Sequence, residues 1–289
     1  MSGVVPTDSG FARHNRRRRS PWLSFGLLIP CVFVVVLGIA VWVPQWLSSF
    51  DPEEVDPNAI LLPPDAQHWF GTDELGRDLF SRVVYGTSQS LTIGIGATLI
   101  ASIGGIVLGT TAALAPRPIG GLLLRIIDIL LAFPEMLLAL LVIAVLGRGP
   151  ANTLLAVGLA GIASYARLIR SQVLHIKLSG YVEHAVALGE HPWTIITQHI
   201  VPNAIRPLLI LATIGVGSSV LSASALSFLG LGVVPPAAEW GALLANGRNF
   251  LDIAPWTSLL PATVVALSVI SITLLGRRLQ TLLATGDLR

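Results

Sequence analysis

The sequence predicts an all-α membrane protein with six transmembrane helices. Of the 289 residues, 53% are hydrophobic and only 12% are charged, and the mean hydropathy is +0.75. A soluble domain carries about 25% charged residues, so half of the usual solubilising charge is missing. These values argue against an ordinary soluble enzyme. The single cysteine, Cys31, also excludes an intrachain disulfide and a cysteine-rich metal site.

Long stretches without charge define the expected spans. Five such stretches occur along the chain, and a sixth apolar run is interrupted only by Asp128 and Glu135. A spanning helix needs about 20 mainly apolar residues to cross about 30 Å of hydrocarbon. We therefore expect transmembrane helices near residues 22–47, 89–114, 126–146, 153–173, 205–230 and 255–275.

The distribution of basic residues predicts how the chain is oriented. The four arginines Arg16–Arg19 precede the first span as in a signal peptide, but its apolar core is too long and no small-residue cleavage site follows. Six spans place 14 of the 18 basic residues on the side of the two termini, which predicts cytoplasmic termini. The expected parts are a basic segment 1–21, a first helix 22–47, an extracytoplasmic segment 48–87, a core of five helices 88–277 and a tail 278–289.

The outer segment 48–87 is expected to hold one short helix. Its second half, residues 71–82, reads GTDELGRDLFSR. The side chain of Thr72 or Asp73 can accept hydrogen bonds from the free N–H groups at a helix start. On physical grounds alone, a helix lying on the membrane surface accounts for this stretch.

The inner segment 174–203, which we call the elbow, is the most informative part of the sequence. Residues 181–188 are expected to form a short helix that Gly189 ends by adopting a positive φ. Pro192 fits the first turn of a second short helix, and Pro202 is expected to mark the bend into the next span. An elbow of this kind contributes little to a membrane protein that acts alone. A membrane protein that binds a soluble partner, in contrast, needs such a projecting segment as its docking surface.

The elbow resembles the EAA loop of ATP-binding-cassette (ABC) importer permeases, whose pattern is E-A-A, three residues, glycine and a later hydrophobic-proline pair. Glu183, Ala185, Gly189 and Pro202 stand in those places, and His184 replaces the middle alanine. Further motifs resemble the C-type permease of dipeptide and oligopeptide importers. These motifs, spread over residues 69–275, are the GTDELGRD of 71–78, Ser81-Arg82, Tyr85-Gly86, the Tyr-Ala-Arg of 165–167, the LSFLGLG of 226–232, Pro235-Pro236, Trp240-Gly241, Gly247-Arg248 and Ala254-Pro255-Trp256.

The resemblance implies a type I ABC importer permease fold in a bacterial inner membrane, without an ATPase site. The chain's only lysine, Lys177, indeed lies outside any P-loop pattern. The implied partners are a homologous second permease, two ATP-binding subunits or a fused ATPase that binds ATP and Mg, and an extracytoplasmic substrate-binding protein. No cofactor bound by this chain and no nucleic acid is implied. The implied ATPase-coupling residues are Glu183, Ala185, Gly189, His191, Trp193 and Pro202.

Two acidic residues lie inside the third expected span. Asp128 is three residues from Arg125 and is expected to pair with it on one helix face. Glu135 lies deeper, where a carboxylate is costly and indicates function. It faces either the translocation pathway, where it would meet an ammonium group of the substrate, or a partner helix. Small residues in the fifth span favour close helix packing, with Ser218 and Ser222 as the expected pathway pair.

Several functions stay open at this point. Di- or oligopeptides are the expected substrates, and nickel complexes or glutathione are alternatives within the family. An ion-coupled secondary transporter often shows inverted repeats and broken helices with paired acids, and neither is clear in the sequence. A membrane-embedded enzyme is disfavoured because no catalytic cluster converges. No metal site is expected either, because the elbow histidines lack the i, i+4 spacing of a helical metal pair; they are His175, His184, His191 and His199.

Overall fold

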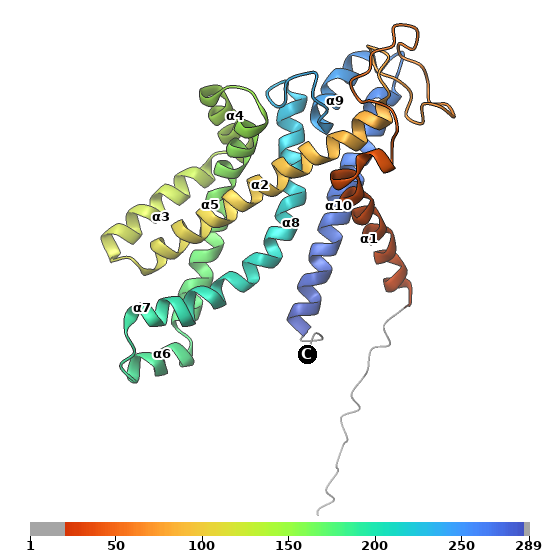
Figure 1. Ribbon diagram of the computed structural model, residues 1–289. Helices are drawn as coiled ribbons and strands as arrows, with labels where there is room; N and C mark the ends of the chain where they lie inside the picture. Colours follow the sequence, from red (N-terminus) through yellow and green to blue (C-terminus); the bar gives the residue numbers. More distant parts are fainter. Residues whose placement is uncertain (1–20, 286–289) are drawn as a thin grey trace, which may run out of the picture.

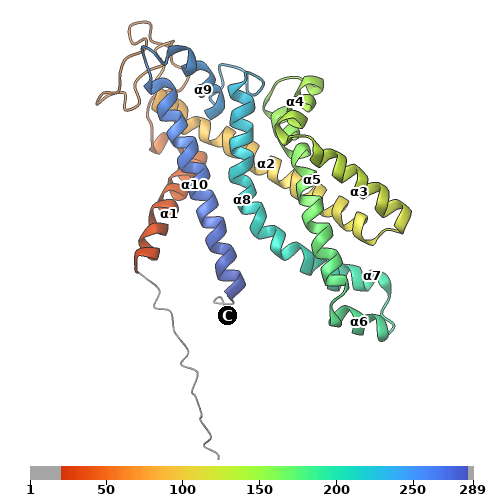
Figure 2. The ribbon, with the colours of Figure 1, turned by 180° about the vertical axis from the view of Figure 1, so that it is seen from behind.

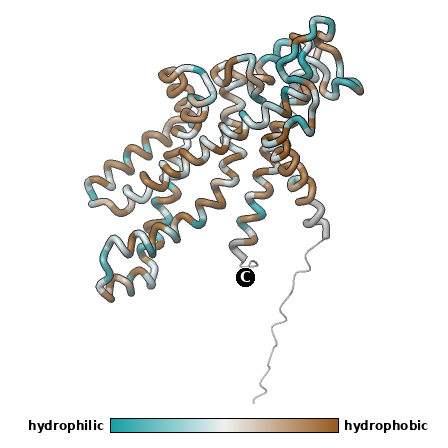
Figure 3. The backbone as a smooth tube through the Cα atoms, in the orientation of Figure 1, coloured by the Kyte–Doolittle hydropathy of each residue, from teal (hydrophilic) through white to brown (hydrophobic). Residues whose placement is uncertain are grey.

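The computed structural model describes residues 21–285, and the regular elements in this range are helices (Figure 1). The body of the molecule is hydrophobic, and hydrophilic residues gather at its two ends (Figure 3). One end, the loop end, holds residues 47–78 and a short helix, α9. The other, the elbow end, holds the elbow. Figure 2 shows from behind that these two ends lie far apart.

The elements follow one another through short connections, apart from residues 47–78. In chain order they are α1 (Pro21–Trp42), η1 (Pro44–Trp46), α2 (Leu79–Leu114), α3 (Arg117–Ala132), α4 (Glu135–Leu146), α5 (Pro150–Lys177), α6 (Gly180–Ala187), α7 (Pro192–Thr194), η2 (Ile195–Ile200), α8 (Val201–Phe228), α9 (Trp240–Gly247), η3 (Arg248–Phe250) and α10 (Trp256–Thr285).

Four of the six predicted spans are confirmed as continuous apolar helices. Among the described residues, α2, α5, α10 and a helix formed jointly by α7, η2 and α8 are each long and apolar enough to cross a bilayer. The helices α3 and α4 meet this criterion only as a bent pair. The stretch Leu27–Trp42 of α1 is a shorter apolar helix.

The third predicted span is broken, so the expectation of one helix over 126–146 is wrong. Helix α3 ends at Ala132, α4 begins at Glu135, and the two axes differ by 95°. Pro134 causes the break because it has no N–H and its ring clashes with the preceding helical turn. It also drives Phe133 into an extended conformation (φ −88°, ψ 138°).

Helix α2 starts ten residues before the predicted second span. Its N-terminal cap is Asp78, whose Oδ2 accepts a hydrogen bond from the backbone N–H of Ser81 at 2.7 Å. The predicted separate helix capped by Thr72 or Asp73 is therefore wrong. Thr72 instead forms an isolated β-bridge with Asp78, and Asp73 precedes the turn at residues 74–75. The polar first turns of α2 are buried beneath the loop end, so the helix does not need to break at the edge of the apolar stretch.

Pro202 lies inside a continuous helix, so the predicted bend between two separate helices at this position is also wrong. The helix runs from Pro192 to Phe228. The six residues of η2 that precede Pro202 form a π-helix, in which the N–H of Val201 bonds to the carbonyl of Ile196. Local π-helical adjustment of this kind satisfies the backbone groups that a proline frees.

The tightest helix contact is between α2 and α5. A Cβ atom on Gly105 would lie 2.4 Å from Cβ of Tyr165, and one on Gly109 would lie 2.4 Å from the carbonyl oxygen of Ala166. Only glycine allows the two backbones to approach this closely. The two glycines, one turn apart, therefore hold α5 close against α2. This contact sets the position of α5 and of its buried side chains.

Candidate functional site

The first arm of the elbow is the predicted short helix, α6. It buries Val182 and Ala185 against the protein. Gly189 ends it with φ +77°, as predicted, and its N–H donates to the carbonyl of Val186 at 3.0 Å. The N–H of Glu190 donates to the carbonyl of Ala185 at 3.1 Å, which completes a glycine-terminated helix cap.

The second arm begins at Pro192, as predicted, and it is one end of the long, curved helix Pro192–Phe228 (Figure 1). The ring nitrogen Nδ1 of His191 accepts a hydrogen bond from the N–H of Trp193 at 3.3 Å and so caps this helix. Through η2 the arm continues directly into α8. A displacement of the elbow therefore acts on a helix that reaches the loop end (Figure 1).

Polar and apolar contacts hold the two arms together. Across the bend, Nε2 of His199 lies 3.0 Å from Oε2 of Glu190. Within the second arm, the backbone carbonyl of His199 accepts a hydrogen bond from the side chain of Asn203 at 2.7 Å. Beneath these contacts lies one apolar cluster from α5, α6, η2 and α8, which contains Ile169, Val173, Ile176, Val182, Ala185, Ile195, Ile200, Ala204 and Leu208.

The outer surface of the elbow carries exposed apolar side chains. Trp193 is 68% exposed, and Tyr181, Val186 and Leu188 are exposed beside it. Of the six residues predicted to couple to an ATPase, Ala185 is 5% exposed and packs in the apolar cluster. The other five lie at the surface: Glu183, Gly189, His191, Trp193 and Pro202.

At the loop end, a buried arginine links segments that are far apart in the chain. Arg82 is 1% exposed, and its guanidinium donates to the carbonyls of Pro52 at 3.0 Å and Pro236 at 3.4 Å. Its Nε lies 3.4 Å from Oδ2 of Asp73, which also binds Nε of Arg77 at 2.7 Å. The GTDELGRD stretch thus builds an internal ionic cluster, which sequence patterns did not indicate.

Helix α9 was also missed, although one signal for it exists. Glu239 precedes it and caps it, because its two carboxylate oxygens accept the N–H groups of Gly241 and Ala242 at 2.9 Å each. Ser90 of α2 accepts the N–H of Trp240 at 3.0 Å and contacts the Glu239 carboxylate. Glu239 is 1% exposed, and this burial raises the pKa of its carboxyl above the ordinary value.

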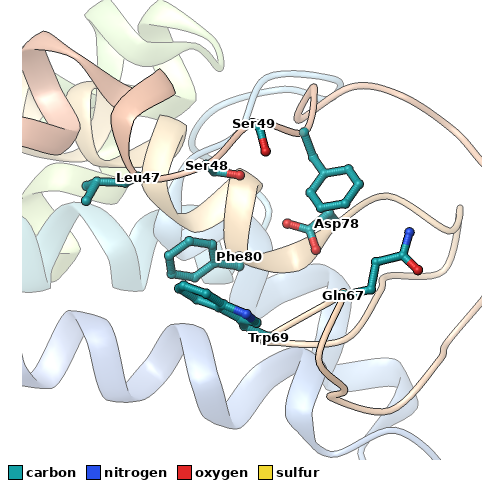
Figure 4. Close-up of a pocket in the computed structure, with 8 residues that line it drawn as sticks. Leu47, Ser48, Ser49, Gln67, Trp69, Asp78 and Phe80 are labelled. Carbon is teal, nitrogen blue, oxygen red and sulfur yellow. The ribbon is translucent and has the colours of Figure 1, made fainter.

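The loop end also holds a cavity of about 140 Å³ (Figure 4). The rings of Trp69 and Phe80 form one wall, with centroids 5.1 Å apart. Asp78 lies on the opposite side, where its carboxylate is 2.9 Å from Nδ1 of His68. The lining residues are Leu47, Ser48, Ser49, Phe50, Gln67, Trp69, Asp78 and Phe80.

The two acids of the broken span have different surroundings. Asp128 pairs with Arg167 of α5, so the predicted pairing with Arg125 of the same helix is wrong. The reason is that α5 packs beside α3 and brings a guanidinium directly to the carboxylate. Glu135 is the first residue of α4, and its Oε1 lies 3.8 Å from the Cβ position of Gly161 on α5.

The predicted serine pair lies on α8 beside a polar contact with α2. Ser218 is exposed and Ser222 is half-buried. Between them, Ser219 accepts a hydrogen bond from the hydroxyl of Thr98 at 2.9 Å. Tyr165 of α5 also reaches α8 here, since a Cβ on Gly215 would lie 2.0 Å from its hydroxyl oxygen.

Comparisons with known proteins were made for the whole chain. The family described as "Binding-protein-dependent transport system inner membrane component" matches residues 105–286. The dipeptide transport system permease protein DppC of Alkalihalophilus pseudofirmus is 40% identical over 255 residues, covering 88% of this chain and 83% of the relative. The glutathione transport system permease protein GsiD of Escherichia coli O6:K15:H31 is 38% identical over 275 residues, covering 91% and 89%.

A solved structure shares the fold. It is an inward-facing form of the MetNI methionine ABC transporter, with a TM-score of 0.57 and 18% identity, covering 68% of this chain and 94% of that one. The all-helical architecture of this chain is therefore similar to that of an ABC importer permease.

Proposed function

The chain belongs to the family of binding-protein-dependent transport system inner membrane components. From this membership we propose that the chain is one permease subunit of an ATP-driven importer and carries di- or oligopeptides across the membrane. Peptide cargo is supported by the name of the dipeptide permease DppC. Glutathione, which is itself a peptide, is the alternative cargo that the name of GsiD supports. A nickel complex is a further alternative within the family.

The observation that carries this proposal is the elbow. Its exposed tryptophan, tyrosine, valine and leucine side chains lie at a hydrophilic end of the molecule (Figure 3), where lipid would not cover them. Large exposed apolar patches mark interaction sites. We assign this surface to a soluble ATPase subunit, which would supply ATP and Mg, and we assign the contact to Glu183, Gly189, His191, Trp193 and Pro202, with Ala185 as their packing support.

The proposed topology has six crossings. It counts α1 and the bent pair α3–α4 as spans in addition to the four continuous ones. The elbow and both termini are then cytoplasmic, which agrees with the excess of basic residues on that side. The loop end faces the outside, where its surface and cavity would meet a substrate-binding protein. A second, homologous permease would complete the pathway, which we assign to Glu135, Ser218 and Ser222.

One structural feature favours a different class of transporter. A broken helix such as α3–α4 is frequent in ion-coupled secondary transporters, where it carries paired intramembrane acids. Here the acid on α3, Asp128, pairs with an arginine instead. An ion-coupled transporter also has no soluble ATPase subunit that would bind the elbow. Both observations favour the ATP-driven importer.

Recovery of partners tests the proposal. The chain is tagged, co-expressed with the ATPase and second permease subunits proposed for it, and purified in mild detergent. Recovery with two ATPase subunits and a sister permease is expected. Trp193→Ser should weaken the recovery of ATPase at least about 30-fold, because large aromatic anchors dominate interfaces. Trp69→Ser at the loop end is the matched control, since Trp69 is 63% exposed and lies far from the elbow. Equal loss of ATPase in both variants would contradict the assignment.

A further inference from the structure

Within the part of the chain that the structure describes, the carboxylate of Glu135 has no partner. Among residues 21–285, no hydrogen-bond donor or cation lies within bonding distance of it. Its side chain is exposed on the helical body, next to the break at Pro134. The other acid of the broken span, Asp128, is neutralised by Arg167. Among the described residues of α3 and α4, Glu135 is therefore the acid without a partner.

Glu135 lies at a helix start, and a glycine of the neighbouring helix faces it. Glu135 is the first residue of α4, where the helix dipole stabilises a negative charge. Gly161 of α5 faces it, and a Cβ added there would meet only Ala101 and Oε1 of Glu135. The absent side chain lets the carboxylate lie against the backbone of α5.

An ionised carboxylate in this position cannot face lipid at acceptable cost. Ionisable side chains inside membranes face a water-filled cavity or the interior of a bundle, and they mark substrate or ion pathways. The surface of Glu135 therefore belongs to the pathway or to an interface. A positive group of another molecule can pair with the carboxylate at this surface.

Neutral polar groups continue from Glu135 toward α8. Tyr165 lies on α5, one helical turn beyond Gly161. The ring then reaches Gly215 of α8. Hydroxyl groups of this kind can donate to or accept from amide groups, but they carry no charge. The arrangement offers one anionic point followed by neutral hydrogen-bonding groups.

We propose that Glu135 binds the free ammonium group of the transported peptide during its passage, with Tyr165 as a positioning residue beside it. This rests on the peptide importer proposed above. A peptide with a free amino terminus presents one ammonium group followed by neutral amides, which matches the order of charges and hydroxyls on the protein. A charge-assisted hydrogen bond of this type contributes more than a neutral one.

Uptake measurements test the role of the charge. The complete importer is reconstituted in proteoliposomes, and the uptake of radiolabelled alanyl-alanine is measured with saturating loaded binding protein. Glu135→Gln should reduce the rate about 10- to 100-fold, the loss expected for a charged hydrogen bond. Glu135→Asp keeps the charge and should restore most of the rate. Asp128→Asn is the matched control and should change the rate less than about 3-fold, because that acid is already paired. Wild-type rates in Glu135→Gln would overturn the proposal.

A labelling experiment reports on the site independently of the cargo. Glu135→Cys is made in a Cys31→Ser background and treated with a water-soluble, membrane-impermeant thiol reagent. We expect rapid labelling that slows when loaded binding protein and ATP are present. Failure to label in any state would place the residue against lipid or the sister permease and overturn the proposal, as would labelling that cargo does not slow. If the wild-type importer takes up no alanyl-alanine while labelling behaves as expected with another peptide, the dipeptide assignment fails and the site stands.

Discussion

Replacing Gly189 by alanine isolates the backbone conformation that ends the first arm of the elbow. Gly189 has φ +77°, and no atom lies within 4 Å of the position that a Cβ would take. The cost of the substitution is therefore conformational, about 1–2 kcal/mol for a non-glycine residue in this region. A cost of that size changes the population of the native elbow about 5- to 30-fold.

Gly180→Ala is the matched control on the same helix. Gly180 is the first residue of α6, it lacks a positive φ, and its Cβ position is equally free of neighbours. Alanine is a better helix former than glycine by about 1 kcal/mol. This control should leave the elbow unchanged or slightly more stable, although it adds the same methyl group.

The assay measures coupling in the reconstituted importer, as peptide taken up per ATP hydrolysed. Gly189→Ala should lower this ratio severalfold, because ATPase movements reach α8 through an elbow that is less often formed. Gly189→Pro should abolish uptake, since proline fixes φ near −65° and removes the N–H that donates to Val186. Equal ratios for Gly189→Ala and Gly180→Ala, or normal ligand-stimulated ATP hydrolysis in Gly189→Pro, would refute the lever role of the elbow.

Three further predictions concern other contacts. Glu190→Gln or His199→Ala should lower the coupling ratio by up to about 5-fold, because a half-exposed pair contributes up to about 1 kcal/mol; a loss above 20-fold would contradict this. Gly109→Leu should destabilise the purified protein by at least about 1–3 kcal/mol in detergent unfolding, because its Cβ would lie 2.4 Å from a backbone oxygen of α5. Gly121→Leu is the control and should not destabilise the protein, because no atom lies within 4 Å of the Cβ position of Gly121. Burial raises the pKa of Glu239, so the folded state binds the proton of this carboxyl more strongly than the unfolded state does. The free energy of unfolding should therefore fall as the pH rises from the ordinary glutamate pKa to the raised one. Glu239→Gln should remove this dependence, which is measured by thermal unfolding between pH 4 and pH 8.

Composition and local sequence signals were sufficient for much of the fold. Charge-free stretches located α2, α5, α8 and α10 because hydrocarbon length sets the length of a spanning helix. Gly189 and Pro192 located the bend of the elbow because each has a strong backbone preference that does not depend on tertiary contacts. These features are encoded within a few neighbouring residues.

The errors arose where tertiary contacts decide the structure. Proline has the same chemistry at positions 134 and 202, yet it breaks one helix and is accommodated by a π-helical turn in the other. Asp128 pairs across helices with Arg167 because the packing of α5 supplies a nearer partner than its own helix. The early start of α2 and the position of α9 depend on the buried contacts of Arg82 and Glu239, which join residues more than 145 positions apart.

The candidate site was predictable in its parts and not in its assembly. The pattern around Glu183 identified the elbow, but the contact between Glu190 and His199 that holds its two arms together has no signature in the sequence. Glu135 stood out because of its intramembrane position. That it has no partner among residues 21–285 could be known only once the neighbouring helices were in place.

The central claim is that this chain is a passive gate driven by nucleotide hydrolysis in partner subunits. It is tested most directly by measuring peptide accumulation in proteoliposomes that contain either this chain alone or the complete importer. The account predicts accumulation only with the sister permease, ATPases, loaded binding protein and ATP together. Accumulation by the isolated chain, driven by an ion gradient without ATP, would contradict it.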